Sequence, residues 1–208
     1  MDALPELVNV ITNRLHTSYR QTGTTTGRLS SNDPNLQNIP VRTGLGRRVR
    51  EAFISGKGSS LLAADYSQIE LRVLAHFSRD PALMKAFENG EDIHSATSSL
   101  VYDVPIDKVG SDMRRIAKVL NFGVIYGLSP HGIARQTNLS QADGKKFIDI
   151  YFNKYPGIQE YLDGVKTQCR EKGYVETILG RRRYLPDISA KNFRLRSQAE
   201  RAAILSLI

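Results

Sequence analysis

Four side chains spaced four residues apart constrain the fold of this chain most strongly. Arg114, Lys118, Phe122 and Tyr126 lie in the segment RRIAKVLNFGVIYG, 114–127, with the two cations before the two aromatic residues. Four residues turn an α-helix slightly more than once, so these side chains would follow one helical edge, here called the ridge. The N-terminal end of a helix favours phosphate, and aromatic rings suit a base or a sugar. The spacing therefore predicts a nucleotide-binding helix.

An ordinary amphipathic helix is the alternative explanation of the ridge, with the cations in water and the two aromatic rings in the core. Two glycines weigh against it, because Gly123 and Gly127 would each cost about 1 kcal/mol in a helix interior relative to alanine. Their presence indicates the close approach of a large group such as a base pair. A separate apolar stripe also supplies a core face without the ridge: Val119, Leu120, Val124 and Ile125.

The net charge of +8 favours a polyanionic partner, which could be nucleic acid or an anionic membrane surface. An apolar content of 40% is ordinary for a soluble globular protein. No apolar run approaches the roughly 20 residues of a spanning helix. The first ten residues, MDALPELVNV, are acidic where a signal peptide would be basic. We therefore expect a cytoplasmic protein.

The few cysteines and histidines exclude several classes of site. Cys169 is the single cysteine, so an internal disulfide and a thiolate zinc site are excluded. The four histidines lack the paired spacing of a zinc-binding helix, and no serine lies in a nucleophile-elbow pattern. A hydrolase is therefore disfavoured. The histidines are His16, His76, His94 and His131.

One aspartate follows a short apolar run. Residues 15–60 are rich in turn-forming and polar residues and predict strands with ordered loops. The run SSLLAADY, 59–66, then predicts a buried strand that ends at Asp65, where sheet proteins often place active-site groups. Asp65 is either the N-cap of the next helix or a metal ligand. With a triphosphate on the ridge, a Mg²⁺ ligand is favoured, because Mg²⁺ binds one or two carboxylates.

The second part of the chain, from about residue 80, is expected to be mostly helical. Asp80 followed by Pro81 predicts a helix start, and Ser140 with Asp143 resembles a capping box. Ser111 is the expected cap of the ridge helix. Residues 174–185 predict a hairpin that carries three arginines at its tip: Arg181, Arg182 and Arg183. The expected helices cover 69–77, 81–90, 92–101, 112–127, 141–155, 156–173 and 190–205.

Two motifs carry a family resemblance. DYSQIELR, 65–72, and RRxxKxxxFxxxYG, 114–127, resemble motifs A and B of family A DNA polymerases, the bacterial DNA polymerase I type. TGRLSSNDPNLQNIP, 26–40, EDIH, 91–94, and GYVETILGRRRYLPD, 173–187, are similar to that family in the same order. The similarity covers nearly the whole chain.

The resemblance implies a role for each site residue. Asp65 and the Tyr66 carbonyl would bind the catalytic Mg²⁺ ions. Arg114, Lys118 and His94 would hold the triphosphate, and Lys118 would also protonate the leaving pyrophosphate. Phe122 would stack on the incoming deoxynucleotide. Tyr126 would lie at the template position with Glu70 bonded to it, which closes the space of a ribose 2′-hydroxyl, and Gln68 belongs to the same nucleotide-binding set. The residues expected to contact primer–template DNA are Arg28, Gln37, Asn38 and Arg201.

The chain departs from the family at one essential position. In the family a second catalytic aspartate lies in a later His-Asp-Glu motif, and this sequence contains none. Leu205 stands where the family has asparagine. We therefore expect a fragment with an α+β fold: a partial palm at 1–80 with motif A, helical fingers at 81–190, and a truncated helix at 191–208. Two-metal nucleotidyl transfer is the implied reaction, and the isolated chain should be nearly inactive.

Two alternatives remain open. The basic loops and aromatic residues could grip DNA without chemistry, as in a non-catalytic DNA-binding module. Replacing Asp65 with asparagine distinguishes the two, because only a metal site would lose Mg²⁺-dependent nucleotide binding. The second alternative is an RNA-copying polymerase. Glu70 and Phe122 favour deoxynucleotides instead, and Phe122 further predicts discrimination against dideoxynucleotides, which Phe122→Tyr should relieve in a completed enzyme.

Overall fold

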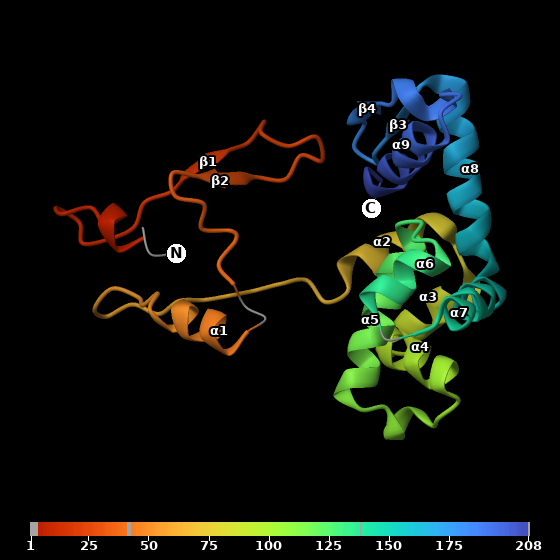
Figure 1. Cartoon of the computed structure of the whole chain (residues 1–208), viewed down its shortest axis with the longest axis horizontal. Coiled ribbons are helices and arrows are strands. Elements are labelled where there is room, and N and C mark those ends of the chain that lie inside the picture. Colours follow the sequence, from red (N-terminus) through yellow and green to blue (C-terminus); the bar gives the residue numbers. More distant parts are fainter. Residues whose placement is uncertain (1–3, 41–42, 138, 208) are drawn as a thin grey trace. The chain divides into compact units, whose positions relative to one another are not determined.

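The computed structural model describes residues 4–40, 43–137 and 139–207 (Figure 1). The chain forms two compact units that meet in the sequence between Tyr66 and Ser67. The fold class is α+β, as expected, because helices dominate and the strands form two short antiparallel hairpins. The division into palm and fingers near residue 80 concerns the subdomains of a larger polymerase and stays a prediction.

The first unit contains a small hairpin and one helix. Strand β1, Ser18–Arg20, pairs antiparallel with β2, Ser30–Asn32, and Ser18 lies opposite Asn32. A 3-10 turn, Pro5–Leu7, precedes the hairpin. Helix α1, Gly44–Glu51, was not predicted, because two glycines and three arginines obscure its apolar periodicity. Its N-cap is Thr43, whose side chain accepts a hydrogen bond from the Gly46 backbone.

The predicted buried strand at 59–66 is wrong. These residues have no regular secondary structure, and Leu61 and Leu62 are 70% and 93% exposed. A strand is stabilised by backbone hydrogen bonds to a neighbour, and none of the described strands pairs with this segment. The apolar composition alone therefore does not produce a strand here.

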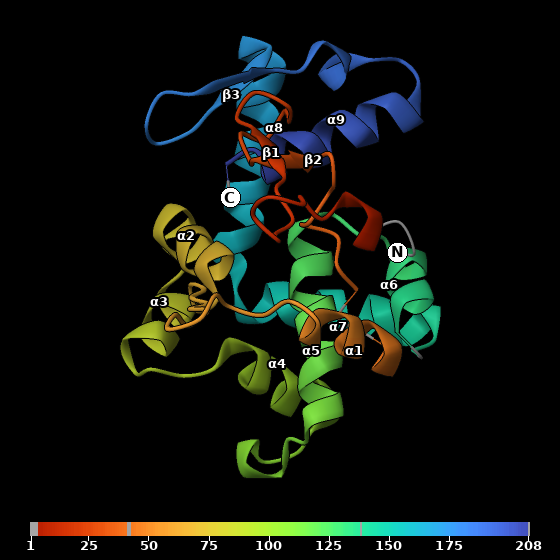
Figure 2. The same ribbon diagram turned by 90° about the vertical axis from the view of Figure 1, so that its left-hand side faces the viewer.

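The second unit is built from helices and a hairpin (Figures 1 and 2). Its elements are α2 Ile69–Ser78, α3 Pro81–Glu88, α4 Ile93–Tyr102, a 3-10 turn Ile106–Lys108, α5 Ser111–Ile125, α6 Pro130–Gln136, α7 Gln141–Lys154, α8 Pro156–Lys172, β3 Tyr174–Glu176, β4 Arg182–Tyr184, a 3-10 turn Pro186–Ser189 and α9 Phe193–Leu205. Helix α6 had not been predicted. No helix among the described residues is long and apolar enough to cross a membrane.

Most of the predicted helix boundaries are confirmed. The Asp80 carboxylate caps α3 by accepting from the Leu83 backbone at 2.9 Å. Ser140 and Asp143 form the expected capping box of α7. Helix α8 begins at Pro156, and Gly173 ends it with a φ of 76° in the left-handed region. These signals are local in sequence, so they act in any tertiary context.

Three local predictions need correction. The N-cap of α5 is Gly110, because its backbone is already extended there and Ser111 is the first helical residue. Helix α5 ends at Ile125, so Gly127 lies outside the helix with a φ of 67°. Arg182 and Arg183 belong to strand β4, which pairs with β3, so only Arg181 lies in the connection between the strands.

The core of the second unit consists of two hydrophobic clusters joined by α8. The larger cluster gathers side chains of α2 to α8, among them Leu74, Leu120 and Phe147, and also Ile204 of α9. The smaller cluster packs α8 against the hairpin and α9. Tyr161 of α8 contacts both clusters. In Figure 1, α8 runs from the α2–α7 group to the hairpin and α9, so it holds the two parts of this unit together.

Candidate functional site

The ridge lies on α5 and its C-terminal end. Leu120, Val124 and Ile125 are buried on the core face, whereas Arg114 and Lys118 are exposed. Phe122 and Tyr126 are partly buried and stack on each other with ring centroids 5.9 Å apart. The cations of the ridge are thus separate from the core stripe, whereas the Tyr126 ring packs against the larger hydrophobic cluster. Val119 of the predicted stripe is only partly buried. The aromatic residues form one continuous surface beyond the cations.

A hydrogen bond joins the end of the ridge to α2. The Tyr126 hydroxyl donates to Glu70 Oε2 at 2.5 Å. Glu70 lies in the first turn of α2, 56 residues earlier in the sequence. The contact expected from the resemblance is therefore present, and it fixes the Tyr126 ring beside Phe122.

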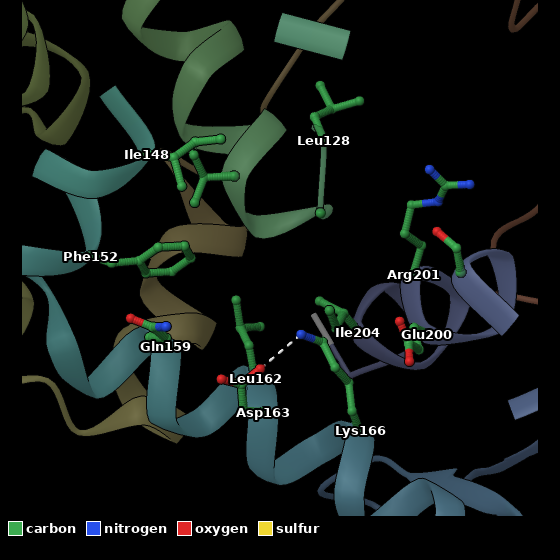
Figure 3. Close-up of a pocket in the computed structure, with 13 residues that line it drawn as sticks. Leu128, Ile148, Phe152, Gln159, Leu162, Asp163, Lys166, Glu200, Arg201 and Ile204 are labelled. Atoms are coloured by element: carbon green, nitrogen blue, oxygen red, sulfur yellow. Dashed lines mark hydrogen bonds and ion pairs between the residues drawn. The ribbon is translucent and has the colours of Figure 1, made fainter. Parts of the chain in front are cut away.

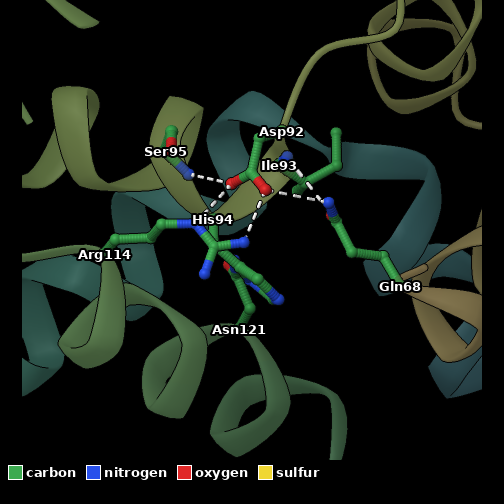
Figure 4. Close-up of polar contacts among 7 residues, drawn as sticks. All are labelled: Gln68, Asp92, Ile93, His94, Ser95, Arg114 and Asn121. Carbon is green, nitrogen blue, oxygen red and sulfur yellow. Dashed lines mark hydrogen bonds and ion pairs between the residues drawn. The ribbon is translucent and has the colours of Figure 1, made fainter. Parts of the chain in front are cut away.

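A carboxylate network surrounds the first ridge cation (Figure 4). Arg114 donates through Nε to Asp92 Oδ1 at 3.2 Å and through Nη2 to Oδ2 at 2.6 Å. Gln68 Nε2 donates to the same Oδ2 at 3.1 Å, and the Ser95 backbone donates to Oδ1 at 2.7 Å. Partial burial alone would raise the pKa of Asp92, but the bonds from Arg114 and Ser95 outweigh it and lower this pKa below its ordinary value.

His94 is held by a chain of buried polar groups. Thr97 Oγ1 donates to Asn121 Oδ1 at 3.0 Å, so the amide nitrogen of Asn121 faces the His94 ring, 2.9 Å from Nδ1. An amide nitrogen only donates, so Nδ1 accepts and the proton of the neutral imidazole lies on Nε2. Burial lowers the His94 pKa to about 4, against the opposing negative charge of Asp92, and the positive charges of Arg114 and Lys118 lower it further. His94 is therefore neutral at pH 7.

Close packing explains Gly123 without a ligand. A Cβ on Gly123 would lie 2.9 Å from Leu128 Cδ1, so the residue that approaches this glycine is Leu128. Gly127 is required by its left-handed backbone, and a Cβ there would lie 3.4 Å from the Arg201 side chain. The two glycines thus serve the turn between α5 and α6, and the inference of a base pair from them is not needed.

A pocket of about 260 Å³ lies between the C-terminal end of α5 and helices α7, α8 and α9 (Figure 3). Its apolar wall includes Leu128, Phe152 and Leu162, and Arg201 lines its polar side. Lys166 in the same pocket is paired with Asp163 at 2.8 Å. Arg201, a predicted DNA-binding residue, therefore lies next to the turn that ends the ridge helix.

The remaining predicted residues belong to the first unit. Asp65 and Tyr66 are exposed. Gln37 uses both ends of its amide to fix the hairpin: Oε1 accepts from the Ser31 backbone and Nε2 donates to the Leu29 carbonyl, both at 3.1 Å. Arg28 and Asn38 are exposed. Among the described residues, no group of three or more His, Cys, Asp or Glu side chains is arranged to hold a metal ion.

Sequence reasoning missed three residues of this site: Asp92, Thr97 and Asn121. Asp92 had a usable signal, because an aspartate directly before the helical run IHSA is a typical N-cap. Thr97 and Asn121 had none, because their contact joins two helices across 24 residues.

Comparison with known proteins decides the family. The sequence model of DNA polymerase family A matches residues 1–208. The chain belongs to this family. It is 52% identical to DNA polymerase I of Pseudomonas aeruginosa over 203 residues, which is 98% of this chain and 22% of that protein. It is 50% identical to the thermostable DNA polymerase I of Thermus aquaticus, again over 98% of this chain and over 24% of the relative.

A solved POL domain has the same fold. The POL domain of Pol1 from M. smegmatis, in complex with a DNA primer-template and dNTP, superposes with a TM-score of 0.89 at 47% identity. The match covers 99% of this chain and 36% of that one. The chain thus spans about a quarter or less of the curated relatives, and it matches a segment of the solved POL domain.

Proposed function

We propose that this chain is the part of a DNA-directed DNA polymerase that binds the incoming deoxynucleoside triphosphate. The observation that carries the proposal is the ridge: the exposed cations Arg114 and Lys118, in the first turn and at the middle of α5, followed by the stacked rings of Phe122 and Tyr126. Cations and free N–H groups at a helix N-terminus suit phosphate, and an aromatic face suits a base. The names of its relatives support the same reaction.

In this proposal each ridge residue contacts a different part of the nucleotide. Arg114 and Lys118 bind the triphosphate, and Phe122 stacks on the base or sugar. Neutral His94 donates from Nε2 to a phosphate oxygen. The hydrogen bond between Tyr126 and Glu70 fills the space beside the sugar and disfavours a ribose 2′-hydroxyl. In an enzyme with a complete site, Lys118 would give a proton to the leaving pyrophosphate.

Primer–template DNA is the proposed second partner. The solved relative carries a DNA primer-template, and this chain has a net charge of +8. Arg28, Gln37, Asn38 and Arg201 are the proposed contacts. Gln37 already has two backbone partners, so a DNA contact by this residue would add to its structural role in the hairpin.

The metal-binding residues proposed here do not make a complete two-metal site. The Asp65 carboxylate and the Tyr66 carbonyl are oxygen donors of the kind that Mg²⁺ takes. A two-metal site needs further carboxylates, and the described residues form no group of three or more His, Cys, Asp or Glu side chains that could hold a metal ion. We therefore assign nucleotide binding to this chain and expect little or no nucleotidyl transfer by the chain alone.

The proposal is tested by titrating the ¹⁵N-labelled chain with dATP in EDTA-containing buffer and following amide shifts by NMR, a method suited to weak binding. Lys118→Ala should weaken dATP binding about tenfold, because it removes a charge-assisted phosphate contact. Lys145→Ala, which removes an exposed lysine of α7, is the matched control and should leave the affinity within twofold. Equal losses of dATP affinity in Lys118→Ala and Lys145→Ala would show that dATP is held by general electrostatic attraction and not by the ridge.

A second dATP titration, with Mg²⁺ in place of EDTA, separates the proposal from a non-catalytic DNA-binding module. A pure DNA binder would be unchanged or slightly improved by Asp65→Asn, which removes a negative charge. A metal ligand would instead lose the part of dATP binding that Mg²⁺ adds.

A further inference from the structure

Asp92 has four hydrogen-bond donors and links three helices of the second unit. It caps α4 through the Ser95 backbone, receives Gln68 from the residue before α2, and receives two donors of Arg114 from α5 (Figure 4). Gln68 is itself fixed, because its Oε1 accepts from the Ile93 backbone at 3.3 Å. The carboxylate therefore has little freedom to turn away from Arg114.

We propose that Asp92 is a positioning residue that holds the Arg114 guanidinium in the orientation that binds the triphosphate. The inference rests on the proposed function of the ridge. Asp92 does not itself touch the nucleotide, and it acts through Arg114.

The way that Asp92 binds Arg114 leaves donors for a ligand. A guanidinium has five N–H groups, and Asp92 engages one on Nε and one on Nη2. Within the part of the chain that the structure describes, Nη1 of Arg114 makes no hydrogen bond, and the side chain is 44% exposed. Two edges of a planar fork can serve two anions at once. Asp92 binds the edge formed by Nε and Nη2, and the edge that includes Nη1 stays open to phosphate oxygens.

Asp92 has two opposite effects on an anionic ligand, and the sign of the measured change separates them. Its negative charge repels the triphosphate, so removing the charge would tighten binding. Its hold on Arg114 spares the ligand the cost of ordering a long side chain, about 0.5–1.5 kcal/mol, so removing the hold would weaken binding. At 0.15 M salt the repulsion is screened over roughly 8 Å, and we expect the loss of positioning to prevail.

The test uses Asp92→Asn. Asparagine is as good an N-cap as aspartate, so the bond to Ser95 and the start of α4 are retained. Its amide nitrogen, however, replaces Oδ2, the oxygen that accepts from Arg114 Nη2 and from Gln68, and the bond from Arg114 Nε to Oδ1 loses its charge. The control for charge is Asp112→Asn, because Asp112 is 89% exposed and pairs loosely with Arg115 at 3.6 Å. Circular dichroism checks that the variants keep the helical fold.

Titration with dATP in EDTA at 0.15 M salt is followed for five proteins: wild type, Asp92→Asn, Asp112→Asn, Arg114→Ala and the Asp92→Asn/Arg114→Ala double variant. We expect Asp92→Asn to weaken dATP binding about three- to tenfold, the fold-change that corresponds to ordering one side chain. Asp112→Asn should leave binding unchanged or slightly tighter. In the Arg114→Ala background, Asp92→Asn should cause no further loss, because its effect passes through Arg114.

Unchanged or tighter binding in Asp92→Asn would overturn the inference and leave the proposed function standing. If Asp92→Asn weakens dATP binding equally in the wild-type and Arg114→Ala backgrounds, the inference is also overturned, because the role of Asp92 would then be structural. If the wild type binds no dATP, or if Lys118→Ala has no effect on binding, the proposed function fails and the inference with it. The Arg114 Nε–H signal should shift on addition of dATP in wild type and in Asp112→Asn, and it should shift less in Asp92→Asn.

Discussion

At the residue scale, a buried histidine beside two cations gives this site a pH dependence. His94 is 2% exposed, and its pKa in the folded chain is about 4, compared with 6.5 for an ordinary histidine. The unfolded chain therefore takes up a proton as the pH falls below about 6.5, whereas the folded chain does so only near pH 4. Folding stability from this residue is fully present above pH 6.5 and is lost as the pH falls toward 4.

We predict that the free energy of unfolding falls by about 2 kcal/mol between pH 7 and pH 5 because of His94. Urea unfolding at the two pH values measures the difference, and His94→Gln should remove most of it. His131→Gln is the control, because His131 is exposed. A pH dependence that survives in His94→Gln would contradict a depressed His94 pKa.

The ridge could be predicted from sequence because its four residues repeat within a single helix. The residues that hold the site side chains in place could not be predicted from sequence. Asp92 and Asn121 act across helix pairs, and no spacing in the sequence connects them to Arg114 or His94. Side-chain networks of this kind depend on tertiary packing, so they become visible only in the structure.

At the element scale, a glycine inside α8 and the glycine that caps its C-terminal end should respond oppositely to the same substitution. Gly164 lies in the exposed middle of the helix, and a Cβ there meets nothing within 4 Å. Gly173 ends the helix with a φ of 76°, where a Cβ meets no atom but the left-handed backbone disfavours alanine. Gly164→Ala should stabilise the chain by about 1 kcal/mol, and Gly173→Ala should destabilise it by about 1 kcal/mol.

Thermal unfolding of the two variants compares them directly, since both replacements add one methyl group to the same helix. If both substitutions shift the unfolding temperature in the same direction, the C-terminal end of α8 does not have the left-handed cap described here.

The helix predictions succeeded because the signals that mark helix ends are local in the sequence. Asp80, Ser140 and Gly173 mark helix ends through bonds to residues only a few positions away. The strand expected at 59–66 failed because a strand depends on neighbours elsewhere in the chain. Helix α1 was missed because its caps are weak signals beside its glycines and arginines.

At the scale of the whole molecule, the two units bury apolar surface to different extents. Both hydrophobic clusters belong to the second unit, whereas Val10, Ile11, Ile54 and Leu62 of the first unit are each more than 80% exposed. The first unit therefore leaves large apolar side chains in contact with solvent. The chain covers 36% of its solved relative, which is consistent with this difference.

The central claim is that this chain carries the nucleotide-binding part of a family A polymerase site without the carboxylates that complete it. Primer extension tests it most directly, on primed DNA with Mg²⁺ and four deoxynucleotides, using the wild-type chain, Asp65→Ala and a full-length DNA polymerase I relative as the positive control. We predict extension by the relative and none by either form of the chain. Extension by the wild-type chain that disappears in Asp65→Ala would contradict the claim, because it would require a second carboxylate within these 208 residues.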